Sequence, residues 1–597
     1  MRTATPATRR RLVRHRACAA FTALAAAGVL LAGCGRAADG AGPPAAPPID
    51  VRAADAALVR AIDDTTQWPT YGRDFANTRY SRLAQITAAN VGSLAPVWVN
   101  HSGIPHSSES NPVVVDGTMY VSTAENHVLA LDARTGRARW EYVHRFKTTV
   151  DCCGPINKGV SVYGGRVFMA TADARMVALD AGTGAKLWDV QVGDNEAGYH
   201  MTGTPLAVDG LVISGVSGGE QGCRCYVDAY DAGTGARVWR WYTVPSPAEG
   251  GWWGPWREHD PWGTSWSRDI AKEKADSAKY PDSWQHGGGP AWHHPAYDPA
   301  LGLLYVNVGN PAPDLDGTER PGDNLYTDCV VALDVRTGKV RWYYQLVSHD
   351  LWDYDASPPP LLTDVRDATG QLVPAVVQAG KVPWVYILDR RTGTPIRRSD
   401  MYLPTKNLFV PPTTAGVMIM PAALGGTDWS PTAVDPRSGY LYLASNVLPM
   451  LYKKSPALLR QPAQWWAGSV TVGPTGNSGL VTAMDLNTGK VVWQTPTTQP
   501  ILSGVTVTAG GVLFVGLSDN QLVAYDARTG RRLWSGAAPA GVNAPPITYM
   551  LDGVQYVAVA ATGAMNVGSQ RGDALLTFAL PRTAAASDSA HRTGGAR

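Results

Sequence analysis

Cysteine is scarce in this sequence, and its few cysteines lack the spacings that mark common haem and zinc sites. There are seven in 597 residues. None belongs to a Cys-x-x-Cys-His segment, which excludes a covalently attached c-type haem, and no grouping of Cys with His is typical of zinc ligands. Low charge (17%) together with 63 glycines and 21 tryptophans favours an all-β protein that is rich in turns.

Most of the chain also lacks an excess of positive charge. The formal net charge is +2, but residues 1–16 contain six arginines and no acidic residue. Removing these six from the 52 basic residues leaves 46 against 50 acidic residues, a net charge of about −4. The basic isoelectric point therefore gives no reason to expect a nucleic-acid partner.

A comfortable membrane span is missing as well. The apolar run Ala17–Leu31 is short and rich in alanine, and it follows the arginines as in a signal peptide. Its end, Leu31-Ala-Gly-Cys34, resembles the bacterial lipobox, in which Cys34 becomes the lipidated N-terminus. An ordinary signal peptide with an incidental cysteine is the alternative, and Thr8-Arg-Arg-Arg-Leu-Val13 also resembles a twin-arginine export signal.

We therefore expect a signal peptide over residues 1–33 and a lipidated, flexible tether over residues 34–66, with Pro43 to Pro48 in it. The protein would be exported and anchored as a lipoprotein to the outer face of the cell membrane. Whether export uses the Sec or the twin-arginine route stays open.

One pattern recurs along the chain: a small residue, an apolar residue, Asp, two variable residues, Thr-Gly, three further residues and Trp. Its copies are Ala130–Trp140, Ala178–Trp188, Ala229–Trp239, Ala332–Trp342, Ala483–Trp493 and Ala524–Trp534. Looser copies are Ile387–Ile396, Tyr297–Pro299 and Val434–Pro436. Repetition every ~40–50 residues is typical of solenoids and propellers.

Each part of the repeat has a structural reason. The Asp suits the first position of a turn, where its carboxylate accepts backbone N–H groups, and the Gly can adopt a positive φ. The Trp can wedge between neighbouring sheets and donate its indole N–H to a backbone carbonyl. Because one such sheet cannot bury both faces, copies must stack, and four-stranded units of this length predict a β-propeller. A β-helix is the competing repeat fold, but its period is shorter.

We expect an all-β, eight-bladed propeller that forms one domain over residues 67–581. The first strands (Trp68 to Trp98) and the last (Tyr556 to Leu580) would share a blade and close the ring. Residues 582–597 are small and polar and are expected to be disordered.

The cysteines outside the N-terminal segment are Cys152, Cys153, Cys223, Cys225 and Cys329. Export would permit disulfides. An adjacent pair is usually a coincidence in a reduced protein, but in an exported one a vicinal disulfide between Cys152 and Cys153 is plausible.

Several motifs stand in a fixed order along the chain. They are Trp68-Pro-Thr-Tyr-Gly-Arg-Asp-Phe-Ala-Asn-Thr-Arg-Tyr-Ser81, Glu109, Cys152-Cys153, Ser217-Gly-Gly-Glu220, Gly287-Gly-Gly with Trp292, Gly309-Asn-Pro-Ala-Pro313, Arg320-Pro-Gly-Asp-Asn324 and His349-Asp-Leu-Trp-Asp353. Together they resemble the alcohol dehydrogenases that depend on pyrroloquinoline quinone (PQQ), a family that includes methanol and ethanol dehydrogenase large subunits and the membrane glucose dehydrogenase. The resemblance implies an eight-bladed propeller with PQQ and a metal ion on its axis.

The resemblance also implies roles for single residues at the cofactor. Trp292 would stack under the PQQ ring, and a disulfide between Cys152 and Cys153 would cover its other face. The alternative for Trp292 is a further propeller tryptophan, although it lies outside the repeated turn. The other expected cofactor-binding residues are Glu109, Lys158, Thr202, Ser217, Gly218, Gly219, Lys381 and Asp428. Lys381 would stand near the quinone oxygens, where a cation stabilises developing negative charge.

By the same resemblance, Glu220 and Asn310 are oxygen ligands of the metal ion, which acts as a Lewis acid. Asp353 would be the catalytic base that takes the substrate's hydroxyl proton, as well as a metal ligand. Asp355 would point to the same side in an extended segment, and a third carboxylate suits a lanthanide. However, Trp-Asp-x-Asp also resembles the glucose dehydrogenases, which use a divalent metal, so Ca²⁺ and a lanthanide both stay open. Alone, residues 349–355 could be a solvated acidic loop.

The sequence departs from the family at four positions. Lys158 replaces an Arg and so gives up a bidentate fork. Pro290 replaces a hydroxyl residue, and Leu502 stands where relatives have Trp. Asp428 replaces an Asn and adds negative charge near an anionic cofactor. These changes could alter affinity or substrate choice, or mark a propeller that has lost its cofactor.

An insertion over residues 245–290 is crowded with tryptophans: Trp252, Trp253, Trp256, Trp262, Trp266 and Trp284. It could cap the funnel over the cofactor and select substrates, or it could be a packed lid without ligand contact.

Two function classes follow. The first is an extracytoplasmic quinoprotein that oxidises an alcohol, polyol or sugar and passes electrons to an external acceptor, such as a cytochrome or quinone. The second is a non-enzymatic propeller lipoprotein that serves as an assembly or binding scaffold.

Overall fold

The computed structural model describes residues 47–147, 154–455, 460–473, 476, 478–564 and 567–581. The predicted lipidation site Cys34, the signal peptide, the Cys152–Cys153 pair and the C-terminal tail lie outside these residues. The described part contains nine sheets: seven of four strands, one of five and one of three. Eight sheets of four or five strands match the number of blades that the repeats predict, and the all-β propeller fold is confirmed.

Seven of these sheets are four-stranded and mostly follow the chain order. In the first half of the chain the sheets are β3 (Val113–Val115), β4 (Thr118–Ser122), β5 (Val128–Asp132) and β6 (Ala138–Tyr142); β7 (Ser161–Tyr163), β8 (Arg166–Ala170), β9 (Arg175–Asp180) and β10 (Lys186–Gln191); β11 (Leu206–Val208), β12 (Leu211–Gly215), β13 (Tyr226–Asp231) and β14 (Arg237–Tyr242); and β15 (Ala296–Asp298), β16 (Leu303–Asn307), β17 (Cys329–Asp334) and β18 (Val340–Gln345).

The second half continues this series. Its sheets are β19 (Leu361–Arg366), β20 (Leu372–Gln378), β21 (Tyr386–Asp389) and β22 (Pro395–Arg398); β24 (Ala433–Asp435), β25 (Tyr440–Val447), β28 (Ser478–Asp485) and β29 (Lys490–Thr497); the five-stranded sheet of β1 (Tyr80–Ser81), β30 (Val505–Thr508), β31 (Val512–Leu517), β32 (Gln521–Asp526) and β33 (Arg532–Ala537); and the small sheet of β23 (Val417–Ile419), β26 (Met450–Lys454) and β27 (Ser469–Val472).

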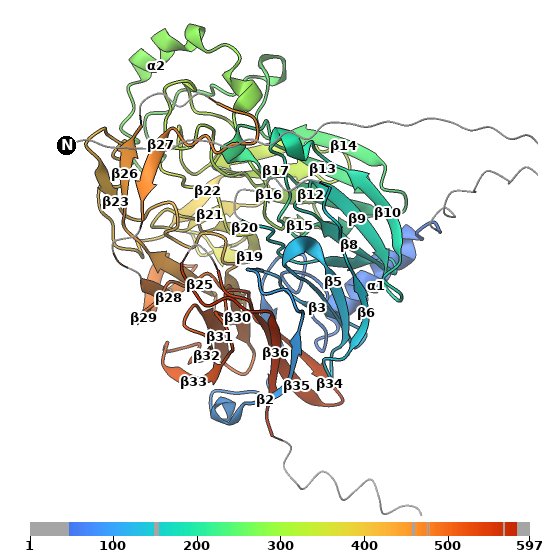
Figure 1. Cartoon of the computed structure of the whole chain (residues 1–597). Helices are drawn as coiled ribbons and strands as arrows, with labels where there is room; N and C mark the ends of the chain where they lie inside the picture. Colours follow the sequence, from blue (N-terminus) through green and yellow to red (C-terminus); the bar gives the residue numbers. More distant parts are fainter. Residues whose placement is uncertain are drawn as a thin grey trace, which may run out of the picture. The chain divides into compact units, whose positions relative to one another are not determined.

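The last four-stranded sheet joins the two ends of the propeller. It consists of β2 (Ala95–His101), β36 (Ala574–Ala579), β35 (Val554–Ala561) and β34 (Ile547–Leu551). Strand β2 pairs antiparallel with β36, and Trp98 lies opposite Thr577. Figure 1 shows the blue strand β2 beside the red strands β34–β36. The predicted closure by the first and last strands is therefore present.

The repeated turn works as the sequence predicts. In the Asp180 turn, the carboxylate accepts the backbone N–H groups of Gly182 and Thr183. The indole N–H of Trp140, from the preceding sheet, donates to the carbonyl of Ala181 at 3.0 Å. The same ring covers Gly184, so tightly that an added Cβ would lie 2.5 Å from it. Four other repeat tryptophans bond to the turn of the next sheet in the same way: Trp188, Trp239, Trp342 and Trp493.

Replacing Gly184 by alanine is therefore expected to lower the free energy of unfolding by about 2–5 kcal/mol. About 1–2 kcal/mol comes from a Cβ at positive φ, and about 1–3 kcal/mol from forcing the Trp140 ring aside. Urea denaturation would measure the loss. Gly165→Ala is the matched control, since Gly165 has the same φ of +73° but open space around its Cβ position. Equal losses in both variants would contradict the role of the Trp140 contact.

The predicted tether is wrong for residues 51–63, which form helix α1 (Val51–Asp63). Asp50 caps the helix by accepting the N–H of Ala53. Ala54 and Leu58, four residues apart and so on one face, are buried in the hydrophobic cluster that includes Tyr163. This apolar pair, rather than flexible composition, decides the structure here. No helix among the described residues is long and apolar enough to cross a membrane.

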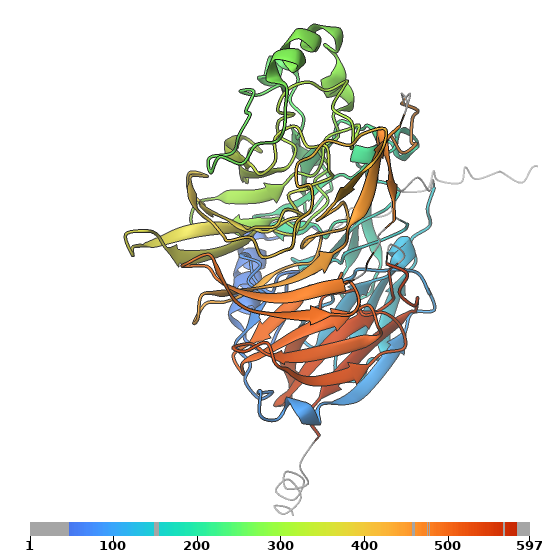
Figure 2. The same cartoon turned by 90° about the vertical axis from the view of Figure 1, so that its left-hand side faces the viewer.

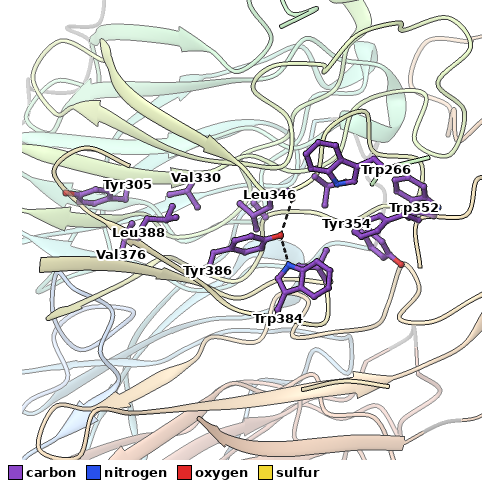
Figure 3. Close-up of a cluster of buried hydrophobic side chains, with 14 of the residues drawn as sticks. Trp266, Tyr305, Val330, Leu346, Trp352, Tyr354, Val376, Trp384, Tyr386 and Leu388 are labelled. Atoms are coloured by element: carbon purple, nitrogen blue, oxygen red, sulfur yellow. Dashed lines mark hydrogen bonds between the residues drawn. The ribbon is translucent and has the colours of Figure 1, made fainter. Parts of the chain in front are cut away.

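The tryptophan-rich insertion contains helix α2 (Ile270–Asp276) and otherwise few regular elements. In both views the green segment with α2 lies at one end of the picture, beyond the strands (Figures 1 and 2). Trp252 and Trp266 are nearly fully buried, whereas Trp262 is 37% exposed. Trp266 belongs to the cluster of buried side chains in Figure 3, together with Trp352 and Tyr354. The insertion therefore packs against the segment that carries Asp353.

Candidate functional site

One cavity of about 440 Å³ gathers most of the predicted site. Ten predicted residues line it: Glu109, Lys158, Thr202, Ser217, Glu220, Trp292, Asp353, Asp355, Lys381 and Asp428. They come from loops of different sheets, and Glu109 and Asp428 are more than 300 positions apart in the sequence. The propeller thus brings together residues that the family resemblance names along most of the chain. The remaining lining residues are Ile156, Pro290, Ala423, Leu424, Trp429, Met450, Trp465, Thr471 and Gly473.

Lys381 is the electrostatic centre of this cavity. Its Nζ lies 2.8 Å from Asp353 Oδ1, 2.7 Å from Asp355 Oδ2 and 3.8 Å from Asp428 Oδ1. Burial alone would lower the pKa of Lys381, but these carboxylates outweigh burial and raise it well above its usual value. Lys381 therefore stays an ammonium that orients Asp353.

The Asp353 loop is held rigidly from behind. The carboxylate of Asp350 accepts the N–H groups of Trp352 and Tyr354. Both of these rings are buried, and they donate to the carbonyls of Val410 and Pro421. Figure 3 shows the two side chains together in the cluster. Asp353 lies between them at φ +63° and lines the cavity, so the anchored neighbours fix its position.

Burial also changes the acidity of the carboxyl groups. It raises the pKa of Asp353 well above its usual value, against the opposing effect of Lys381. It also raises the pKa of Glu220 and that of Asp428, to about 7. The cavity lining contains five acidic side chains and two lysines. A bound cation would relieve this excess of acidic groups.

Asn310 lies directly behind the cavity wall rather than in it. Its backbone N–H donates to Asp355 Oδ1 at 2.7 Å, and its side-chain amide donates to Asp314 Oδ1 at 2.8 Å. These bonds fix the amide, and its Oδ1 is buried without a hydrogen-bond partner among the described residues. A buried oxygen of this kind is suited to a hard cation.

Two carboxylates of the predicted metal site are paired with Lys381. Within the described ranges, no three His, Cys, Asp or Glu side chains are grouped as a ready metal cluster, and the Lys381 ammonium bridges Asp353 and Asp355. The donor chemistry nevertheless fits: Glu220 and the unpartnered Asn310 oxygen supply hard ligands beside the surplus carboxylates. The ligand set of Glu220, Asn310, Asp353 and Asp355 stays a prediction.

An aromatic and charged wall faces these carboxylates. Lys158 pairs with Glu109 at 2.6 Å, and its Nζ lies 4.9 Å from the ring centre of Trp292 and 5.9 Å from that of Trp429. Trp292 therefore lines the cavity as predicted. Trp429 was missed, although it follows Asp428 directly. A flat cofactor that carries carboxylates would meet indole faces and an ammonium here.

The loop that carries Glu220 depends on close backbone contacts. Gly218 has φ +113°, and a Cβ there would lie 2.5 Å from the Gly198 carbonyl oxygen. A Cβ at Gly219 would lie 2.7 Å from Pro290, so the proline found at this departure from the family pattern packs against the loop. Gly218 and Gly219 shape the wall, while Thr202 and Ser217 present hydroxyls to the cavity.

Two other predictions take a different form in the structure. None of the six insertion tryptophans lines the cavity, which favours the packed lid over a substrate-selecting cap. Leu502 is buried against Trp429 and Trp292 and supports the wall from behind. The cavity is lined instead by Met450 from β26, Trp465 from the loop before β27 and Thr471 from β27. No repeat or motif in the sequence marked them.

Comparisons with known proteins point to one family. A family model described as PQQ glucose/ethanol/alcohol dehydrogenase, beta-propeller domain, matches residues 68–401, 397–472 and 476–557. The quinohemoprotein alcohol dehydrogenase of Comamonas testosteroni is 35% identical over 87% of this chain and 76% of its own. The lanthanide-dependent methanol dehydrogenase of Methylacidiphilum fumariolicum is 34% identical over 84% of this chain and 85% of its own.

A solved structure titled "Europium-containing methanol dehydrogenase" superposes with a TM-score of 0.78 at 31% identity, and covers 88% of this chain and all of its own. The match therefore includes the overall fold as well as the sequence. By its sequence and by its fold, this chain belongs to the family of PQQ-dependent alcohol dehydrogenases.

Proposed function

We propose that this protein oxidises an alcohol by hydride transfer to PQQ, assisted by Ca²⁺ or a lanthanide ion. The observation that carries the proposal is the ion pair of Asp353 with Lys381 in the cavity that also exposes Trp292, Glu220 and Lys158. The matching family model, which is named for PQQ, supports the cofactor, and a relative named as a lanthanide-dependent methanol dehydrogenase supports the metal. When bound, these groups would supply the hydride acceptor and the Lewis acid.

The chain's own residues would divide the remaining work. Asp353 would take the hydroxyl proton of the substrate, since burial raises its pKa and so makes its carboxylate a stronger base. Lys381 would hold Asp353 in place and offset negative charge that develops beside it. Trp292 would provide a flat wall, and Lys158 would face an anionic group of the cofactor. Glu220 and the Asn310 oxygen would hold the metal ion.

The rest of the cavity lining favours alcohols with an apolar body as substrates over polyols or sugars. Beyond the residues assigned above, the cavity presents mostly apolar side chains, among them Leu424, Met450 and Trp465, and one further hydroxyl from Thr471. Several hydroxyls of a sugar would be buried there without partners, which costs binding energy. A primary alcohol with an aliphatic or aromatic body needs one polar contact.

Reconstitution tests the proposal. The purified protein would be loaded with PQQ and either Ca²⁺ or La³⁺, and dye-linked oxidation of ethanol, 1-hexanol, benzyl alcohol, glycerol and glucose would be measured. We expect activity with the apolar alcohols, with kcat/KM at least about tenfold above that for glycerol and glucose. A protein that takes up neither PQQ nor metal would overturn the assignment and leave the scaffold alternative.

Asp428 is expected to make PQQ binding depend on pH. Burial raises the pKa of this carboxyl to about 7, against the opposing charge of Lys381. Below pH 7 it is neutral and does not repel an anionic cofactor, whereas above pH 7 it does. The Kd for PQQ at saturating Ca²⁺ should therefore rise about tenfold from pH 6 to pH 8, measured by quenching of tryptophan fluorescence. Asp428→Asn should flatten this dependence; parallel curves would rule the explanation out.

Export and anchoring are part of the same proposal, supported by the arginine-rich N-terminus and Cys34. The electrons would pass to an external acceptor, such as a cytochrome or a quinone. In a bacterial host, Cys34→Ala should release the protein from the membrane fraction. Retention of that variant in washed membranes would refute lipidation at Cys34.

A further inference from the structure

The motif Arg320-Pro-Gly-Asp-Asn324 has no role in the chemistry above, yet its arginine is one of the largest fully buried side chains. The Nε of Arg320 donates to the carbonyl of Pro313, and its Nη2 donates to those of Asp314 and Asp350. Its Nη1 donates to the side chain of Asn324 at 2.7 Å. One guanidinium thus binds backbone groups of two separate loops.

These two loops carry the predicted metal ligands. The carbonyls of Pro313 and Asp314 belong to the loop that begins at Asn310, whose amide is fixed by the Asp314 side chain. The carbonyl of Asp350 belongs to the loop that ends at Asp355. Arg320 therefore connects the two loops through its hydrogen bonds. The hydrogen bond from the Asn310 N–H to the Asp355 carboxylate connects them a second time.

The other end of the motif holds the tryptophan-rich insertion. Asp323 accepts a 2.6 Å hydrogen bond from Arg268 and a 2.9 Å bond from the backbone N–H of Arg257. The Arg268–Asp323 pair is almost fully buried. The backbone N–H of Asp323 donates to the carbonyl of Trp253. The insertion is thus bonded to Asp323, which lies three residues after Arg320. Arg320 in turn connects the two loops that carry the predicted metal ligands.

We propose that Arg320 is a positioning residue that sets the spacing between the Asn310 and Asp353 loops, and that the insertion keeps it in register through Asp323. This proposal rests on the proposed function, because it gives the loops their metal-binding purpose. The insertion then acts on metal affinity, although none of its tryptophans reaches the cavity. A planar guanidinium with five donors suits this task, and a lysine cannot reproduce it.

Terbium binding tests the proposal without relying on turnover. The PQQ-loaded protein would be titrated with Tb³⁺, and tryptophan-sensitised emission would be followed. We expect Arg320→Lys to weaken Tb³⁺ binding about 10–100-fold, as for other residues that orient metal ligands. Asp323→Asn, which keeps the side-chain shape, should weaken it about tenfold. For both variants, the ratio of kcat/KM values for benzyl alcohol and ethanol should stay within about twofold of wild type.

Asp228→Asn is the matched control, because Asp228 is also a buried carboxylate paired with an arginine, Arg240, but lies on strand β13 away from the cavity. It should lower thermal stability and leave Tb³⁺ affinity unchanged. If Arg320→Lys does not fold, Asp323→Asn decides the test. Wild-type affinity in the variants would overturn the positioning role alone. A changed substrate ratio with unchanged affinity would assign the insertion to substrate selection instead. A wild-type protein that binds neither Tb³⁺ nor Ca²⁺ would overturn the proposed function as well.

Discussion

Asp353→Asn should lower kcat about 10³-fold, because an amide cannot accept the hydroxyl proton of the substrate. Positioned general bases contribute about 10²–10⁴-fold to rates, and Asp353 lines the cavity with its carboxylate 2.8 Å from Lys381. The substitution keeps the size of the side chain, and the neighbouring Trp352 and Tyr354 remain anchored. The loss should therefore appear in kcat rather than in folding.

The measurement is dye-linked oxidation of a primary alcohol by the protein loaded with PQQ and metal. PQQ occupancy would be determined from the quinone absorbance, so that a failure to load is separated from a failure of catalysis. Asp519→Asn, at an exposed position outside this cavity, controls for the loss of one carboxylate. A variant that keeps more than about a tenth of wild-type kcat would show that another group takes the proton.

Lys381→Met should lower the free energy of unfolding by about 3–5 kcal/mol near neutral pH, because it leaves buried carboxylates without their cation. Lys381 is 5% exposed and contacts Asp353 and Asp355 directly. In the variant the pKa of Asp353, which burial already raises, would rise further because its cation is gone. At pH values above about 4, where an unfolded aspartate loses its proton, the native state would then bind more protons than the unfolded chain. The variant's stability should therefore fall as the pH rises across this range.

Urea denaturation of the metal-free protein at pH 5 and at pH 8 would measure this effect. The deficit of Lys381→Met relative to wild type should be larger at pH 8, where carboxyls must ionise without a partner. Lys272→Met, which removes an exposed ion pair with Asp276, should change the stability far less at either pH, because solvent screens the pair. A deficit that is equal at both pH values would mean that the Asp353 and Asp355 charges do not depend on Lys381.

Much of this fold could be predicted from the sequence alone, because the propeller repeats one local structure, the turn with its Asp, Gly and Trp. In each copy, the Asp that binds turn N–H groups and the Gly with positive φ act within five positions of each other, and the Trp follows four residues later. Such local chemistry can be read from spacing. This reasoning did not predict the helix at residues 51–63, because its stability comes from burying Ala54 and Leu58 against distant strands.

For the site, the family resemblance named ten of the residues that line one cavity, but not how they pair. Three sets of contacts join loops of different sheets. They are the ion pairs of Lys381 with Asp353 and Asp355, the hydrogen bonds that fix the Asn310 amides, and the hydrogen bonds of Arg320. Leu424, Met450 and Trp465 line the wall without any motif. Local composition determined the turns, the blades and the family, whereas only the closed propeller decided these contacts, because their distances depend on the register of every sheet between them.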